Sequence, residues 1–201
     1  MRLQPTHCQS RFAARAVNHE RIKIATADIK NVQRSRGAPP VILKMIYQLD
    51  ELMTIEDIIP DESAILELRG QQAAEVLVEL AAGLARRSGL DEAPLLERLR
   101  AREALGSTAI GRGLALPHTK ADVRRTYGVL GVARAGVDFE APDGVPVRVL
   151  LALVSPSDPS EHLRALACVS RSFADPGMVE QLIACADTSA MLALLRGELR
   201  C

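Results

Sequence analysis

The ten residues Val145–Val154, with the sequence VPVRVLLALV, are the segment of this 201-residue chain that decides its fold. A nearly continuous run of β-branched and aliphatic side chains is typical of a central strand that is covered on both faces. Residues 64–68 and 126–133 carry shorter runs that also predict strands, and helical patterns lie around them. Strands mixed with helices in this way favour an α/β protein. We therefore expect a three-layer α/β sandwich, with helices on both faces of a mixed central sheet.

Helices are indicated by apolar residues spaced three and four apart and by recognisable ends. The clearest pattern presents Val76, Leu77 and Leu80 on one face and stops at Ser88-Gly89. A second helix opens at Asp91, a favourable N-cap, and Gly106 ends it. Besides a short lead-in helix or turn within 50–60, the predicted helices are residues 72–88, 91–105, 160–174, 177–185 and 188–198.

The composition excludes several classes of protein. Hydrophobic residues make up 48% and charged residues 25%, so the chain is not wholly disordered. No apolar run approaches the roughly 20 residues that cross a bilayer, so we expect no membrane insertion. The four cysteines form no C-x-x-C pair, and reduced thiols are therefore expected at the following positions: Cys8, Cys168, Cys185 and Cys201.

Charge divides the chain into two parts. Residues 1–44 carry nine basic and two acidic side chains, a net of +7, whereas the rest carries 16 basic and 23 acidic, a net of −7. The basic part ends in Gly37-Ala38-Pro39-Pro40, a linker-like sequence. We expect residues 1–44 to be a disordered extension and residues 45–201 to be the folded domain. A basic arm for nucleic acid or an anionic surface, and an Arg-rich transit peptide, are the alternatives.

Two histidines lie at positions that favour a functional role. His118 follows Pro117 at the end of a glycine-punctuated segment, residues 106–118, and His162 lies in the first turn of a helix after the central strand. Ligands of α/β proteins usually bind at the carboxyl ends of strands. A neutral imidazole has a pKa of about 6.5 and a free nucleophilic nitrogen near pH 7. Phosphoryl transfer then needs in-line positioning and neutralisation of the oxygen charges.

The sequence REALGSTAIGRGLALPH, residues 102–118, resembles the signature of the type 2 enzyme IIA family (fructose/mannitol type) of the bacterial phosphotransferase system. That signature is Arg-Glu, then Gly-Ser-Thr, then Gly-x-Gly-hydrophobic-Ala-hydrophobic-Pro-His. A further family feature, a His-Leu pair in a helix after the central strand, matches His162-Leu163. The resemblance covers roughly residues 52–198. It departs from the family at Arg112, where Asn is often found, and a charge beside the site would alter the choice of partner.

The resemblance implies roles for individual residues. His118 would be the phosphorylated nucleophile, and His162 and Arg102 would assist it. Without the resemblance, His162 could cap or pack its helix, and Arg102 could form a surface ion pair of small effect. The other signature residues are implied to bind phosphate or to fix the loop, and they are Ser107, Thr108, Gly111 and Gly113. Without the resemblance, Ser107 and Thr108 could merely end a helix.

Neither a cofactor nor a metal is expected. The two histidines could combine with Asp122 or Glu161 around a divalent ion, but the four residues lack a compact ligand spacing.

Within the family, the chain is most similar to the nitrogen-regulatory branch, because no transporter or fused phosphocarrier domain is evident. This branch is implied to take phosphate from an HPr-like histidine carrier in the cytoplasm. Its phosphorylation state would then regulate partners such as a sensor kinase or potassium transport components. A sugar-specific enzyme IIA that passes phosphate to an enzyme IIB is the first alternative. A binding module that uses the basic extension is the second. No nucleic-acid partner is expected if the chain is an enzyme IIA.

Overall fold

The computed structural model describes residues 53–198. The expected extension over 1–44, residues 45–52 of the expected domain, and the thiols of Cys8 and Cys201 therefore lie outside the described residues. None of the helices in the described range is both long and apolar enough to cross a membrane. The two cysteines within it, Cys168 and Cys185, are buried.

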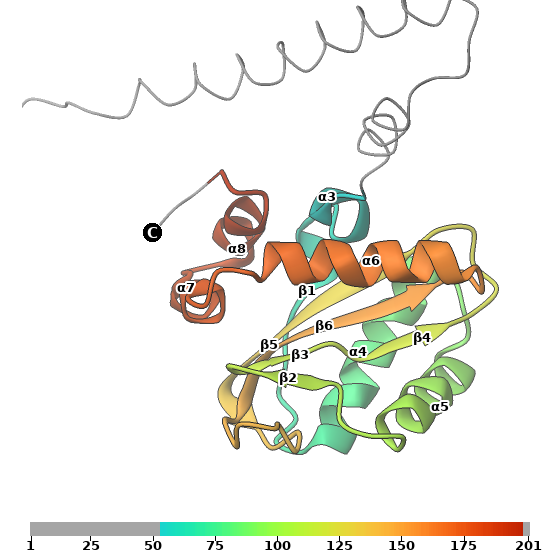
Figure 1. Ribbon diagram of the computed structural model, residues 1–201, viewed down its shortest axis with the longest axis horizontal. Coiled ribbons are helices and arrows are strands. Elements are labelled where there is room, and N and C mark those ends of the chain that lie inside the picture. Colours follow the sequence, from blue (N-terminus) through green and yellow to red (C-terminus); the bar gives the residue numbers. More distant parts are fainter. Residues whose placement is uncertain (1–52, 199–201) are drawn as a thin grey trace, which may run out of the picture. The chain divides into compact units, whose positions relative to one another are not determined.

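A mixed sheet occupies the centre of this region (Figure 1). Its strand order is β1-β5-β6-β3-β2, and β4 pairs with β6 beyond the end of β3. The long strands β5 and β6 are antiparallel, whereas β1 runs parallel to β5 and both β3 and β4 run parallel to β6. The strands are β1 Ile65–Glu67, β2 Ala109–Gly111, β3 Leu114–Ala115, β4 His118–Lys120, β5 Tyr127–Val137 and β6 Val147–Ser155.

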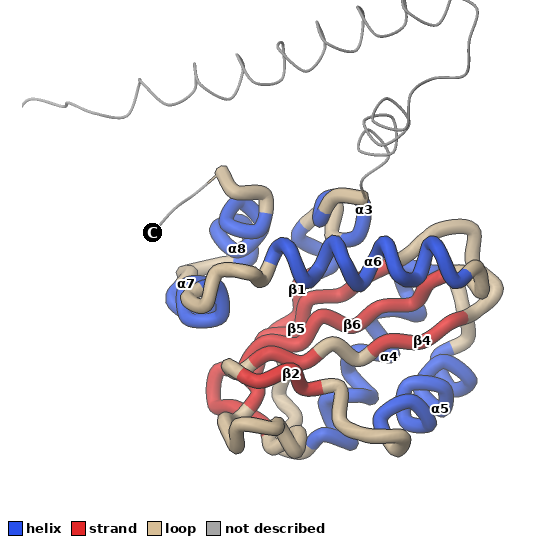
Figure 2. Tube along the Cα trace, in the orientation of Figure 1, coloured by secondary structure: helices blue, strands red, loops and turns tan. Residues whose placement is uncertain are grey.

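Helices cover both faces of the sheet, which confirms the predicted three-layer α/β sandwich (Figures 1 and 2). Alternate residues of β6 enter two cores, so that Leu151 and Leu153 pack toward α6 while Leu150 and Ala152 pack toward α4. The helices are α3 Ile55–Ile58, the 3₁₀ helix η1 Glu62–Ala64, α4 Ala73–Ser88, α5 Glu92–Glu103, α6 Pro159–Ser172, α7 Met178–Ala184 and α8 Thr188–Leu195.

The ends of the helices follow from local hydrogen bonding. Gly89 adopts φ 75° and ends α4, because a left-handed residue stops the helical hydrogen-bond pattern. Asp158 caps α6 by accepting from the backbone N–H of Ser160, and Pro159 occupies the first helical position. The lead-in helix is shorter than the 50–60 window, because a Thr54–Asp57 capping box begins it and Ile59 ends it.

Two strand features go beyond the sequence patterns. The strand predicted to end at Ala133 continues to Val137, because a shift in the β5–β6 register after Val132 and a positive φ at Gly136 allow pairing to resume. The glycine-punctuated segment contains β2 and β3, and His118 begins β4. These short strands depend on pairing with β6, far along the chain, so no local pattern marks them.

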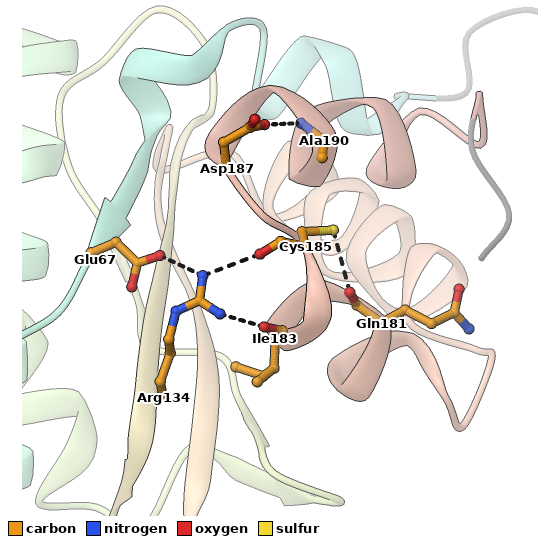
Figure 3. Close-up of polar contacts among 7 residues, drawn as sticks. All are labelled: Glu67, Arg134, Gln181, Ile183, Cys185, Asp187 and Ala190. Atoms are coloured by element: carbon orange, nitrogen blue, oxygen red, sulfur yellow. Dashed lines mark hydrogen bonds and ion pairs between the residues drawn. The ribbon is translucent and has the colours of Figure 1, made fainter.

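A single arginine ties the end of α7 to the sheet (Figure 3). The guanidinium of Arg134, on β5, donates to the carbonyl oxygens of Ile183 and Cys185 and pairs with Glu67 at 2.9 Å. The thiol of Cys185 lies 3.3 Å from the carbonyl of Gln181. Arg134 therefore supplies donors to carbonyls that the helix end leaves without helical partners.

Helix α4 approaches the sheet closely at Gly83. A Cβ atom on this residue would lie 2.8 Å from Leu66 Cδ1 and 3.2 Å from Val129 Cγ1. We predict that Gly83→Val lowers the free energy of unfolding by about 1–3 kcal/mol, because the added methyl groups overpack this contact. Urea denaturation measures the change. Ala82→Val, at a partly exposed neighbour in the same helix, controls for β-branching; equal losses in the two variants would contradict the packing argument.

Candidate functional site

The imidazole of His118 is fixed by the strand that it begins. Residues 118–120 pair in parallel with residues 153–155 of β6, and Leu153 N–H donates to the Pro117 carbonyl at 2.9 Å. His118 Nδ1 lies 2.7 Å from the carbonyl oxygen of Leu116. Because a carbonyl only accepts hydrogen bonds, the proton of the neutral ring resides on Nδ1. The lone pair is therefore on Nε2.

Arg102 donates a hydrogen bond to that lone pair. Its Nε–H, from the last turn of α5, donates to His118 Nε2 at 3.1 Å, and its Nη1 donates to the Gly106 carbonyl at 3.0 Å. No carboxylate in residues 53–198 forms an ion pair with Arg102. The arginine thus lies against the nitrogen that carries the lone pair, and a backbone oxygen holds the other part of its guanidinium.

His162, in the first turn of α6, lies beside His118. The two ring centroids are 5.3 Å apart with an interplanar angle of 49°. His162 Nδ1 lies 2.7 Å from the hydroxyl oxygen of Ser155, a fully buried residue at the end of β6. Ser155 was not among the expected site residues. A serine that ends an apolar strand is the only sequence signal for it, and that pattern equally fits a loop start.

The environment keeps both rings neutral near pH 7. Burial is the largest cause lowering the pKa of His118; the Leu116 carbonyl opposes it and the charge of Arg102 adds to it. Burial likewise lowers the pKa of His162, followed by the charges of His118, Lys120 and Arg102. Each ring therefore stays neutral down to a pH below about 6.5, which is the ordinary pKa of a histidine side chain.

The hydroxyls of the signature hold the loop between α5 and β2. Thr108 is buried and donates to the carboxylate of Glu103, with Oγ1 at 2.6 Å and its backbone N at 2.8 Å. Ser107 donates its hydroxyl to the carbonyl of Phe139 and accepts from the Ala109 N–H. These contacts tie the loop to α5 and to Phe139, and the expected binding of phosphate by Ser107 and Thr108 stays a prediction.

The glycine pair lies away from the imidazole. Gly111, Arg112 and Gly113 all adopt positive φ in the turn between β2 and β3. The Gly113 carbonyl accepts from Val149 N–H, whereas His118 pairs with Leu153, four residues further along β6 and so about 13 Å away. The positive φ values agree with the backbone role expected of Gly111 and Gly113, and phosphate binding by this turn stays a prediction.

Arg112, which was expected to place a charge beside the site, lies in the same turn. This residue is exposed, and its backbone N–H donates to Asp143 Oδ2 at 2.6 Å. Its backbone lies in the turn between β2 and β3 and not at the histidines. In the described chain, no group of three or more histidine, cysteine, aspartate or glutamate side chains is placed to hold a metal ion.

Comparison with known proteins identifies the family. Residues 57–197 match the family model described as "Phosphoenolpyruvate-dependent sugar phosphotransferase system, EIIA 2". A nitrogen regulatory protein from Bradyrhizobium diazoefficiens is 34% identical over 145 residues, which cover 71% of this chain and 95% of that one. The chain belongs to the type 2 enzyme IIA family of the phosphotransferase system, as its signature indicated.

Solved structures agree with this assignment. The nitrogen regulatory protein IIA-Ntr from Neisseria meningitidis superposes with a TM-score of 0.63 at 32% identity, covering 67% of this chain and 94% of that one. The Escherichia coli enzyme IIA for mannitol, solved in complex with its phosphorylated enzyme IIB, superposes with a TM-score of 0.60 at 21% identity, covering 67% and 95%. The second likeness shows the shared fold.

Replacing Arg102 tests the electrostatic account of the site. We predict that Arg102→Ala raises the pKa of His118, because it removes a positive charge and admits water to the ring. Titration of the imidazole resonances by NMR measures the shift. Arg100→Ala, an exposed residue ion-paired with Glu97 on the same helix, should leave that pKa unchanged. An unchanged or lower pKa in Arg102→Ala would rule out this account.

Proposed function

We propose that the chain is a phosphohistidine carrier in which His118 accepts a phosphoryl group from an HPr-like histidine carrier. One observation carries the proposal: the Leu116 carbonyl holds the proton on Nδ1 and leaves the lone pair on Nε2 beside Arg102 and His162. The family supports phosphotransfer as the general role. The carrier activity resides in residues 45–201 and operates in the cytoplasm, where the donor proteins of the phosphotransferase system act.

The proposed reaction is an in-line displacement. The P–N bond of the donor phosphohistidine breaks as a bond forms between phosphorus and His118 Nε2, and the donor imidazole leaves. The phosphorylated ring keeps its Nδ1 proton, whose hydrogen bond to Leu116 becomes charge-assisted. The same bond that selects the nucleophile thus stabilises the product.

Arg102 has two successive roles in this proposal. Its Nε–H must leave the lone pair of Nε2 before phosphorus can approach, while its Nη1 contact with Gly106 keeps the guanidinium close. The displaced group then meets the equatorial oxygens of the transferring phosphoryl group. Neutralising charge on those oxygens is the main protein contribution to such reactions.

His162 is assigned a supporting role at the same oxygens. When Ser155 donates its hydroxyl to Nδ1 of His162, the remaining ring proton is on Nε2 and can be donated. The low pKa of His162 keeps this ring neutral, so it adds a hydrogen-bond donor without a permanent charge.

The destination of the phosphoryl group is proposed from the relatives. The Bradyrhizobium and Neisseria proteins are named as nitrogen regulatory proteins and exceed 30% identity. We therefore favour regulation of partner proteins, such as a sensor kinase or potassium transport components, by the phosphorylation state. A sugar-specific role is favoured by a different relative, the fructose-specific enzyme IIA component of Haloferax volcanii, which is 33% identical over 113 residues. That role would pass phosphate to an enzyme IIB.

Labelling with radioactive phosphoenolpyruvate, enzyme I and an HPr-like carrier tests the reaction. The chain should acquire acid-labile, base-stable phosphate, and His118→Ala should abolish it. His162→Ala should keep the fold and still be labelled, with transfer slower by about 10²-fold because one oxygen donor is lost. Absence of labelling would leave only the binding-module alternative, and full labelling of His118→Ala would reject His118 as the phosphorylated residue.

A second experiment addresses Ser155. We predict that Ser155→Ala slows transfer roughly tenfold to a hundredfold, because the His162 ring loses the contact that orients it. Ser157→Ala, an exposed serine two residues later, should transfer at the wild-type rate. Single-turnover kinetics and the NMR signals of the His162 ring provide the two measurements. An unchanged rate in Ser155→Ala would assign this hydrogen bond to folding alone.

A further inference from the structure

Helix α5 contacts strand β4 through two arginines (Figure 1). Arg98 Nη1 donates to the carbonyl oxygen of Lys120 at 2.9 Å, and Arg102 Nε donates to His118 Nε2 at 3.1 Å. The two arginines are four residues apart, so they lie on the same face of the helix. The first arginine contacts the end of the strand and the second contacts its beginning, so α5 runs antiparallel to β4.

The spacing along the helix matches the spacing along the strand. Four helical residues advance about 6 Å along the helix axis. The two residues from His118 to Lys120 advance about 6.6 Å along the strand. Both contacts therefore form at once in a straight helix and a straight strand, and together they fix how far α5 extends along β4.

The carbonyl group of Lys120 lies on the open edge of the sheet. The Pro117 carbonyl and the Ala121 N–H bond to β6. Because backbone groups alternate in direction along a strand, those of Lys120 point away from β6. In the described part of the chain β4 has β6 as its one neighbouring strand, so Arg98 supplies a donor that a further strand would otherwise supply.

This hydrogen bond adds direction to an apolar contact. Leu95 and Leu99 are buried and hold α5 against the sheet, but burial of apolar surface is not directional. The side chain of Arg98 lies between them in sequence and is exposed. No carboxylate of residues 53–198 forms an ion pair with it, so the Lys120 carbonyl is its polar partner.

The other polar contacts of this helix lie at its end. Arg102 Nη1 donates to the Gly106 carbonyl, which belongs to the same segment and moves with it. Glu103 accepts from Thr108 in the loop before β2. These contacts fix the end of α5 next to the loop, whereas Arg98 fixes a point one turn earlier. Two such points define the direction of the helix relative to the strand that carries the histidine.

We propose that Arg98 is a positioning residue for phosphoryl transfer: by holding the end of β4, it keeps the Arg102 guanidinium within reach of the His118 ring. The inference rests on the proposed phosphocarrier function. In that reaction Arg102 must leave Nε2 and meet the oxygens of the phosphoryl group, and a helix held at two points keeps this movement short. Precision matters here, because a misplacement of about 1 Å can slow an enzymatic step by about 100-fold.

Replacing Arg98 by methionine tests the coupling between the two arginines. Arg98→Met removes the donor and keeps an unbranched side chain that suits a helix. Burial lowers the pKa of His118 most, and the charged side chains that act on it are Arg102, which lowers it, and Glu103, which raises it. Arg98 is not one of these charges, so a rise of that pKa in Arg98→Met reports a displaced Arg102.

Titration of the imidazole resonances by NMR should find the pKa of His118 raised in Arg98→Met, in the direction expected for Arg102→Ala. Adding Arg98→Met to Arg102→Ala should raise it no further, because the first residue acts through the second. Arg100→Met, at an exposed position on the same helix, is the control and should leave the pKa unchanged.

Transfer kinetics supply the second measurement. From the HPr-like carrier, phosphorylated with enzyme I and phosphoenolpyruvate, transfer should slow at least about threefold in Arg98→Met and stay within about 1.5-fold of wild type in Arg100→Met. Phosphoramidate is a small donor whose P–N bond breaks as the bond to His118 Nε2 forms, and ammonia leaves. It should show the same loss, because positioning acts on the chemical step and not on docking.

The outcomes separate this inference from the proposed function. Normal labelling of the wild-type chain, with equal rates and equal His118 pKa values in Arg98→Met and Arg100→Met, would overturn the positioning role alone. A loss confined to the protein donor would also overturn it, since it would assign Arg98 to docking. Additive pKa changes in the double variant would overturn it as well. A wild-type chain that neither donor labels would overturn the phosphocarrier function and this inference with it.

Discussion

The parallel pairing of β4 with the end of β6 is the interaction on which the site depends. It aligns His118 with Leu153 and Lys120 with Ser155, so that one stretch of β6 positions both histidines. His118 is placed through the backbone ladder, and His162 is placed through the Ser155 hydroxyl. The arginine arrives from the helix layer on the opposite face of the sheet. The site is therefore a junction of all three layers at one sheet edge, and no single segment contains it.

The electrostatics of the junction are consistent with this placement. Burial and cationic neighbours both disfavour a charged imidazole, so the rings remain neutral while positive charge is gathered around them. A neutral imidazole surrounded by cations would suit the phosphoryl group of the proposed reaction, which carries several negative oxygens. The cost of that arrangement falls on folding: below pH about 6.5 the unfolded chain binds protons that the folded rings resist, and stability declines as the pH falls.

Much of the fold could be predicted because its signals are local. The run at residues 145–154 indicated a doubly covered strand, and its alternate side chains do enter two separate cores. Gly89 and Asp158 marked helix ends through backbone conformation and capping, which depend on neighbouring residues only. The short strands of residues 109–120 could not be predicted in this way, because they exist only through pairing with distant β6.

The site shows the same division. The histidines and Arg102, singled out by the signature, come together. Gly111, Arg112 and Gly113 lie in the turn between β2 and β3, which adjoins an earlier part of β6 than His118 does. Ser155 was missed, since its only partner in the site is seven residues away on another element.

The brevity of the histidine-bearing strand has a consequence for self-association. Within residues 53–198, β4 has three residues and pairs with β6 alone, so it leaves an open sheet edge at His118. Long, flat, unpaired edges recruit strands from other molecules and promote aggregation. Here Arg98 donates to the Lys120 carbonyl at 2.9 Å, and the chain turns away after Lys120. A strand this short, with one of its acceptors already occupied, offers too small a template for intermolecular β-pairing, even though His118 lies at the open edge.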